Sequence, residues 1–162
     1  MTFRSILAAA ALLSSPFALA ACGSEAPVEE VAAEGIPGLT VTNARVVLPA
    51  VAGNPAAVYM DLAYSADEDR GVAIRRVNVE KAEMAMLHEY VEYDFQTQMV
   101  EMMQMTLQPG DTGSFTPGEA HIMATGLADD VKPGDTLNVT LIAAGGVEMT
   151  VPAEVLPANA AR

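Results

Sequence analysis

Both histidines of the chain and seven of its ten methionines lie within one stretch of forty residues, Met84–Met123. Imidazole nitrogen and thioether sulfur together are ligands of a soft metal ion, above all Cu(I). Within this stretch, ten residues separate His88 from Met99, and twenty-one more separate Met99 from His121. A single residue then lies between His121 and Met123. These four side chains are therefore the candidate ligands of a metal site.

The alternation of side chains along a strand decides which residues can act together with His88. If its surroundings form a strand, Met84, Met86 and Tyr90 lie on the face of His88. Leu87 then lies on the opposite face, which is apolar and is predicted to belong to the core. His88 is therefore expected on the outer face or at the rim of a sheet.

The other three candidate ligands are predicted to come from later strands. Met99 shares its predicted face with Glu101 and Met103. His121 and Met123 are spaced i, i+2, so both can reach one ion from the same face of a strand. How they come close to His88 depends on tertiary structure, which the spacing alone does not reveal.

Three further side chains are candidates for a secondary role. Met86 and Met103 are possible extra ligands, and Glu101 is a candidate either to orient a metal ligand through a hydrogen bond or to bind Cu(II) itself. The alternative for the methionines is packing, since thioethers commonly fill core gaps. The alternative for Glu101 is a solvated carboxylate. A lone histidine is likewise more often structural, and only the joint occurrence of these residues favours a metal site.

Short strands separated by Gly, Pro, Asn and Asp are predicted across residues 38–152, and no long helical period is present. This pattern is typical of an all-β, antiparallel sandwich or barrel. A hairpin turn is predicted near Asp94-Phe95, which would make the strands of His88 and Met99 neighbours. The predicted strands are Leu39–Val47, Ala56–Tyr64, Val72–Val79, Met84–Glu92, Gln98–Leu107, Gly113–Phe115, His121–Gly126, Thr136–Ala143 and Val147–Val151.

The N-terminus predicts export and a lipid anchor. Residues 1–21 combine Arg4 with a short apolar run, which is typical of a signal peptide. The tetrad Leu-Ala-Ala-Cys that ends at Cys22 resembles a bacterial lipobox, in which the cysteine sulfur is lipidated. The alternative is an ordinary export signal cut after Ala21. Gly23, rather than Asp, follows the cysteine, and by the same resemblance this favours the outer membrane, facing the periplasm.

The rest of the chain is predicted to hold one domain. Residues 22–37 are acidic and poor in aromatic side chains, so they are expected to form a flexible tether. Residues 38–152 form the predicted domain, and residues 153–162 are expected to be a disordered tail. Without residues 1–21, seven basic and twenty-one acidic side chains give a formal charge of −14.

This charge and the absence of catalytic motifs exclude several classes of function. A strongly acidic surface argues against nucleic-acid binding, because phosphates would be repelled. The sequence has no Gly-rich phosphate loop and no Cys-x-x-Cys pair, so an enzyme is not expected. The acidic surface would instead attract cations and basic partner surfaces. The protein is expected to be a monomer.

The spacing of the four candidate ligands resembles that of the periplasmic copper chaperones of the PCuAC family, whose mark is His-x10-Met-x21-His-x-Met. The resemblance extends over about residues 41–151. It includes Leu87-His88-Glu89 at the site, Pro117-Gly118 before the second histidine, and Lys132-Pro133-Gly134-Asp135 after it. The chain departs from the family at the Asp94-Phe95 turn, where Asn-Gly or Gly-Gly is frequent, and at Val100 and Glu119-Ala120.

The resemblance implies a single cupredoxin-like β-sandwich domain with a Cu(I) site near its surface. His88, Met99, His121 and Met123 would be the ligands. It further implies a periplasmic chaperone, tethered to the membrane, that delivers copper to an acceptor, either the copper centre of cytochrome c oxidase or an assembly factor of that enzyme. Binding should weaken below about pH 6.5, because only neutral imidazole ligates a metal.

Two other functions fit the same residues. One is a lipoprotein that scavenges zinc or Cu(II) through His88 and His121 with Glu101 or Glu119. The other is an interaction lipoprotein without a metal, in which the histidines and methionines only pack. Binding of Cu(I) that depends on the methionines would distinguish the copper chaperone from both.

Overall fold

The computed structural model of the protein describes residues 35–66 and 70–161. The predicted signal peptide, Cys22 and nearly all of the predicted tether lie outside these residues. The described strands are β1 (Leu39–Val47), β2 (Ala56–Tyr64), β3 (Val72–Val79), β4 (Met84–Tyr93), β5 (Gln96–Glu101), β6 (Met105–Leu107), β7 (Thr112–Phe115), β8 (His121–Thr125), β9 (Thr136–Ala143) and β10 (Glu148–Leu156), followed by the short 3-10 helix η1 (Ala158–Ala161).

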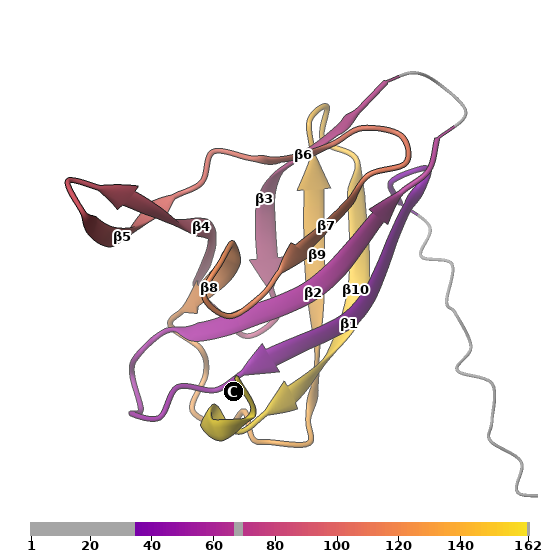
Figure 1. The fold of residues 1–162 in the computed structure, drawn as a ribbon. Helices are drawn as coiled ribbons and strands as arrows, with labels where there is room; N and C mark the ends of the chain where they lie inside the picture. Colours follow the sequence, from indigo (N-terminus) through magenta and orange to yellow (C-terminus); the bar gives the residue numbers. More distant parts are fainter. Residues whose placement is uncertain (1–34, 67–69, 162) are drawn as a thin grey trace, which may run out of the picture. The chain divides into compact units, whose positions relative to one another are not determined.

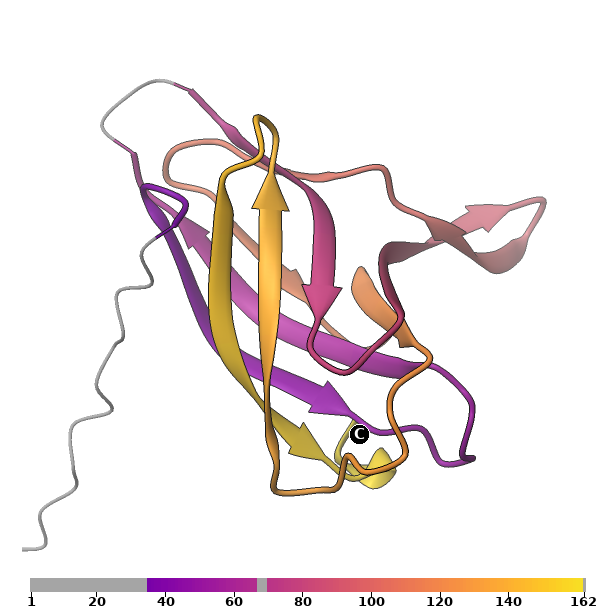
Figure 2. The ribbon, with the colours of Figure 1, turned by 180° about the vertical axis from the view of Figure 1, so that it is seen from behind.

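The strands form one sheet in the order β5-β4-β8-β2-β1-β10-β9-β3-β6, and β7 also pairs with β2. Although β3 and β4 lie near opposite ends of this order, a short turn joins them and they contact each other. The sheet therefore curls over itself into two layers. Figure 1 shows β1 and β2 in front of β3 and β9, and Figure 2 shows the same layers from behind. The predicted all-β class is confirmed.

One strand pair departs from the predicted antiparallel arrangement. β1 and β10 run parallel, with Arg45 opposite Glu154 and Val47 opposite Leu156. Parallel neighbours need a long connection rather than a hairpin, and here almost the whole domain lies between the two strands. The sheet is therefore mixed, and the first and last strands of the domain join its two layers.

The end of the domain lies further along the chain than predicted. β10 does not stop near Pro152 but continues to Leu156, and η1 follows it. Proline usually ends a strand because it lacks an N–H donor. Here Pro152 is exposed, whereas Ala153 and Val155 are fully buried, so alternation continues past the proline. The first four residues of the predicted tail, up to Leu156, are thus part of the sheet, and η1 follows them.

The single strand predicted over Gln98–Leu107 is wrong, because the chain changes partners within it. β5 pairs with β4, and β6 pairs with β3 on the other side of the curled sheet. Residues 102–104 connect β5 to β6. The N–H of Met102 donates a hydrogen bond to the carbonyl oxygen of Leu87, with 2.8 Å between nitrogen and oxygen. An uninterrupted run of strand-forming residues does not reveal such a change of partner.

The predicted turn at Asp94-Phe95 is confirmed and has an unusual backbone. Tyr93 pairs with Gln96, so the two residues between them close a two-residue hairpin. Both have positive φ, 50° for Asp94 and 58° for Phe95. Such turns favour Asn-Gly or Asp-Gly, so the strain falls on Phe95, because side chains other than those of Gly, Asn and Asp are strained in this region. Figures 1 and 2 show this β4–β5 hairpin projecting away from the rest of the sheet.

Replacing Asp94-Phe95 by Asn-Gly is expected to raise the free energy of unfolding by about 1 kcal/mol, because the strain at the turn is removed. Phe95 is 94% exposed, so its side chain contributes little packing that could be lost. Urea denaturation would measure the change. Phe95→Ala is the control, since alanine keeps the strain; an equal gain in that variant would contradict the explanation.

Candidate metal centre

Three of the four candidate ligands, His88, His121 and Met123, lie together on the outer face of β4 and β8. These strands pair in a register that places His88 directly opposite His121, and Met86 directly opposite Met123. Directly opposite residues on one face of an antiparallel pair have Cβ atoms about 4.5–5.5 Å apart. The structure therefore brings two imidazoles and two thioethers together from parts of the chain that are more than thirty residues apart.

The two imidazole rings face each other, and a tyrosine ring closes one side. The ring centroids of His88 and His121 are 6.1 Å apart, with 25° between the planes. The ring of Tyr90 lies 5.4 Å from that of His121 and is tilted by 31°. The predicted shared face of His88 and Tyr90 is thus consistent with the positions of their rings.

His121 is held in the tautomer that a metal ligand needs. The side chain is 5% exposed, and its Nδ1 lies 2.8 Å from the main-chain carbonyl oxygen of Glu119. A carbonyl only accepts hydrogen bonds, so Nδ1–H is the donor and Nε2 keeps a free lone pair. Metal-binding histidines commonly have such an orienting hydrogen bond on the ring nitrogen that is not bound to the metal.

His88 has an unsatisfied nitrogen next to this ring. Its Nδ1 is buried and has no hydrogen-bond partner among the described residues. A buried polar atom without a partner costs about 1–3 kcal/mol. A soft metal ion bound at this nitrogen would satisfy it, so the donor set fits such an ion.

Met99 lies beside this group rather than within it. It is directly opposite Tyr90 on β4, and Glu101 is opposite His88. Met99 therefore shares the face of His88 but is displaced by one strand and by one two-residue step toward the hairpin turn. Its side chain is 44% exposed.

Two secondary candidates of the sequence analysis differ in their placement. Met86 lies opposite Met123 within the group, whereas Met103 is in the segment between β5 and β6 and is 83% exposed. The structure therefore brings Met86, but not Met103, onto the β4–β8 ladder. Glu101 lies at the edge of the site, because it is directly opposite His88.

Tyr59 of β2 is a neighbour that the sequence analysis missed. Ala57 is opposite Met123, so Tyr59, two residues further on, lies on the same face. The guanidinium of Arg45 lies 5.2 Å from the centre of the Tyr59 ring. Burial raises the pKa of Tyr59, as does Tyr90, and Arg45 only partly opposes them. The alternation of β2, once its register on β8 was known, would have indicated this wall of the site.

Residues 35–66 and 70–161 contain no group of three or more His, Cys, Asp and Glu side chains that could hold a metal ion. The alternative zinc or Cu(II) site would need such a group, made of the two histidines with Glu101 or Glu119. Glu119 contacts His121 through its main-chain carbonyl. The side chains that gather around the histidines on the β4–β8 ladder are thioethers instead.

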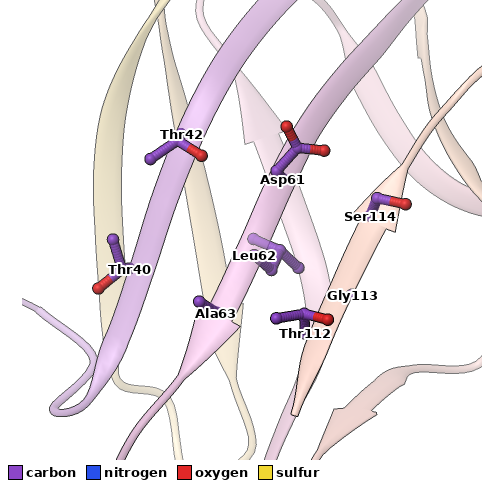
Figure 3. Close-up of a pocket in the computed structure, with 8 residues that line it drawn as sticks. All are labelled: Thr40, Thr42, Asp61, Leu62, Ala63, Thr112, Gly113 and Ser114. Carbon is purple, nitrogen blue, oxygen red and sulfur yellow. The ribbon is translucent and has the colours of Figure 1, made fainter. Parts of the chain in front are cut away.

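A groove on the face of β2 that carries Tyr59 is separate from the candidate ligands. It has a volume of about 410 Å³ and is lined from β1, β2 and β7, as Figure 3 shows. Its polar groups are hydroxyls and one carboxylate, Asp61, whose oxygen accepts a hydrogen bond from the Asn43 side chain at 2.6 Å. None of the four candidate ligands lines it. The lining residues are Thr40, Thr42, Asp61, Leu62, Ala63, Thr112, Gly113 and Ser114.

Residues 39–155 match the family model "LpqE-like: Putative lipoprotein LpqE-like". The chain belongs to the LpqE-like lipoprotein family. Lipoproteins of this kind are anchored to a membrane outside the cytoplasm, and the family agrees with the expectation that the protein is not an enzyme. None of the described residues forms a helix long and apolar enough to span a bilayer. A search of curated proteins found no match.

Solved structures show which fold this LpqE-like chain has. A copper-bound PCuAC domain from PmoF2 superposes with a TM-score of 0.61 and 18% identity, over 75% of this chain and 95% of that domain. The apo PCuAC domain from PmoF1 gives 0.59 and 21%, over 74% and 94%. The Cu(I) form of DR1885 from Deinococcus radiodurans gives 0.54 and 24%, over 80% and 85%. The resemblance to the PCuAC fold is thereby confirmed.

His121→Ala is expected to lower the affinity for Cu(I) at least about tenfold, since loss of a group that merely orients a metal ligand already costs about 10–100-fold. Glu119→Ala is the control, because the main-chain carbonyl that accepts from His121 remains. Its affinity should equal that of the wild type in a competition titration. An equal loss in both variants would instead indicate that the Glu119 carboxylate is a ligand.

Proposed function

We propose that the protein is a Cu(I) chaperone that acts outside the cytoplasm. His88, Met99, His121 and Met123 bind the ion, and an acceptor metalloprotein receives it. The observation that carries the proposal is the direct pairing of His88 with His121, with Met123 on the same face and Nε2 of His121 free to bind. Two of the solved structures that share this fold are described as copper-bound or Cu(I) forms.

The choice of Cu(I) follows from the chemistry of the donors. Thioethers are neutral and soft, so they favour Cu(I) and offer little to hard cations. Glu101 is the carboxylate directly opposite one of the histidines, and it is exposed to solvent. A site dominated by imidazole and thioether therefore selects Cu(I) over zinc or calcium.

Delivery is supported by the exposure of one ligand. Met99 lies on a projecting hairpin and is 44% exposed, so a ligand of an incoming protein can reach the ion from that side. A purely structural site would not need this access. The proposed acceptor is the copper centre of cytochrome c oxidase or one of its assembly factors. Lipidation of Cys22 would hold the domain at a membrane, and Gly23 favours the outer one.

Titration with Cu(I) under reducing conditions, against a chromophoric chelator, tests the proposal. One ion should bind per chain, and excess Zn²⁺ should not displace it. X-ray absorption of the loaded protein should then find two nitrogen and two sulfur scatterers. Mixing with a copper-free acceptor domain should transfer the ion. Absence of Cu(I) binding, or a site of nitrogen and oxygen alone, would overturn the proposed function.

A further inference from the structure

Met86 has a position that the proposed ligand set does not use. It is directly opposite Met123 and two residues before His88 on the same strand face. Its side chain is half-buried, and the neighbouring Leu87 is held in the core. Met86 is thus presented from the firmly packed part of β4, beside both histidines and a proposed thioether ligand.

The register puts Met86 nearer to Met123 than Met99 is. Residues i and i+2 of a strand are about 6.6–6.8 Å apart, and directly opposite residues have Cβ atoms about 4.5–5.5 Å apart. Met86, His88, His121 and Met123 therefore occupy the corners of a small rectangle. Met99 lies outside it, on the far side of the histidine pair and on the next strand. Methionine is unbranched with three rotatable bonds, so either sulfur can reach toward the pair.

We propose that Met86 is a copper ligand that alternates with Met99. In one arrangement the ion is held by His88, His121, Met123 and Met99, and in the other Met86 takes the place of Met99. This inference rests on the proposed function. The step is an exchange in which a copper–sulfur bond to Met86 forms as the bond to Met99 breaks; the ion stays Cu(I), and no proton or electron moves.

The exchange gives the exposed hairpin a defined role in delivery. Met99 is on the β4–β5 hairpin, which projects from the sheet, while Met86 is on the part of β4 that pairs with β8. When Met86 holds the ion, the position of Met99 becomes open on the solvent side. An acceptor ligand can enter there while His88, His121, Met123 and Met86 still hold the copper.

A double-mutant cycle tests the alternation. Met86→Leu and Met99→Leu should each cost only a few-fold in Cu(I) affinity, because the other methionine replaces the one removed. The double variant should lose about tenfold more than the product of the single losses, a coupling typical of groups that share one partner. X-ray absorption should find two sulfurs in each single variant and one in the double variant.

Met84→Leu is the matched control. Met84 is on the same face of β4, one two-residue step further from the histidines, and it is opposite Thr125. It should leave the affinity unchanged alone and add nothing to Met99→Leu. If Met86→Leu also adds nothing to Met99→Leu, or if Met99→Leu alone leaves one sulfur, the alternation is wrong although Cu(I) binding stands. If the wild type binds no Cu(I), the proposed function itself fails.

Discussion

Replacing both Met99 and Met123 by leucine is expected to lower the affinity for Cu(I) at least about a hundredfold, because loss of a single orienting group around a metal site already costs about 10–100-fold. The histidines stay in place, so any remaining site has at most one sulfur, supplied by Met86. Leucine has nearly the volume of methionine, and such exchanges usually cost less than about 1.5 kcal/mol even in a core. The metal-free variant should therefore keep the fold, which circular dichroism and thermal unfolding would check.

A second pair of methionines from the same stretch provides the control for this variant. Met102 and Met105 are partly buried and pack against the core. Replacing both by leucine makes the same chemical change away from the histidine pair, and the affinity should stay that of the wild type. Retention of wild-type affinity in the Met99→Leu, Met123→Leu variant would contradict the thioether site and favour binding by histidine and carboxylates.

The bounds of several strands could be predicted from local chemistry. β1, β2, β3 and β9 begin and end where the sequence indicated, because alternation and turn residues mark both ends. The features that the sequence analysis missed depend on which strands pair with one another. After Glu101 the chain stops pairing with β4, and β6 then pairs with β3. β10 continues past Pro152 because the buried side chains beyond the proline pack between the two layers. A period of two shows which residues share a face, but not which strand lies beside them.

The same limit separates what could be predicted of the site from what could not. Alternation placed Tyr90 with His88, and Met123 with His121, and the structure agrees. The direct pairing of His88 with His121 required the return of β8 to β4, across three intervening strands of the sequence. For the same reason, the sequence predicted Met86 and Met103 alike as possible extra ligands, although only Met86 is the direct neighbour of Met123.

Ile122→Ala is expected to be the most destabilising of these changes. Ile122 lies between the proposed ligands His121 and Met123, is fully buried, and is directly opposite Leu87 on the core face. Truncation should lower the free energy of unfolding by about 2–5 kcal/mol, and Ile122→Val by about 0.5–1.5 kcal/mol, because the cavity left in the core grows with the methyl groups removed. Denaturation of the metal-free protein in urea would give both values.

Copper should restore part of the stability lost in Ile122→Ala. An ion that binds only the folded state adds about 2.7 kcal/mol at a free concentration one hundred times its dissociation constant. The side chain of Ile122 faces the core and not the ion, so the variant keeps all the proposed ligands. Val100→Ala, a partly exposed position on β5, is the control and should change the stability by less than about 1 kcal/mol. If Cu(I) stabilised the wild type but not Ile122→Ala, the packing of Ile122 would be needed to form the site itself, and its proposed role as a core anchor that leaves the ligands intact would be wrong.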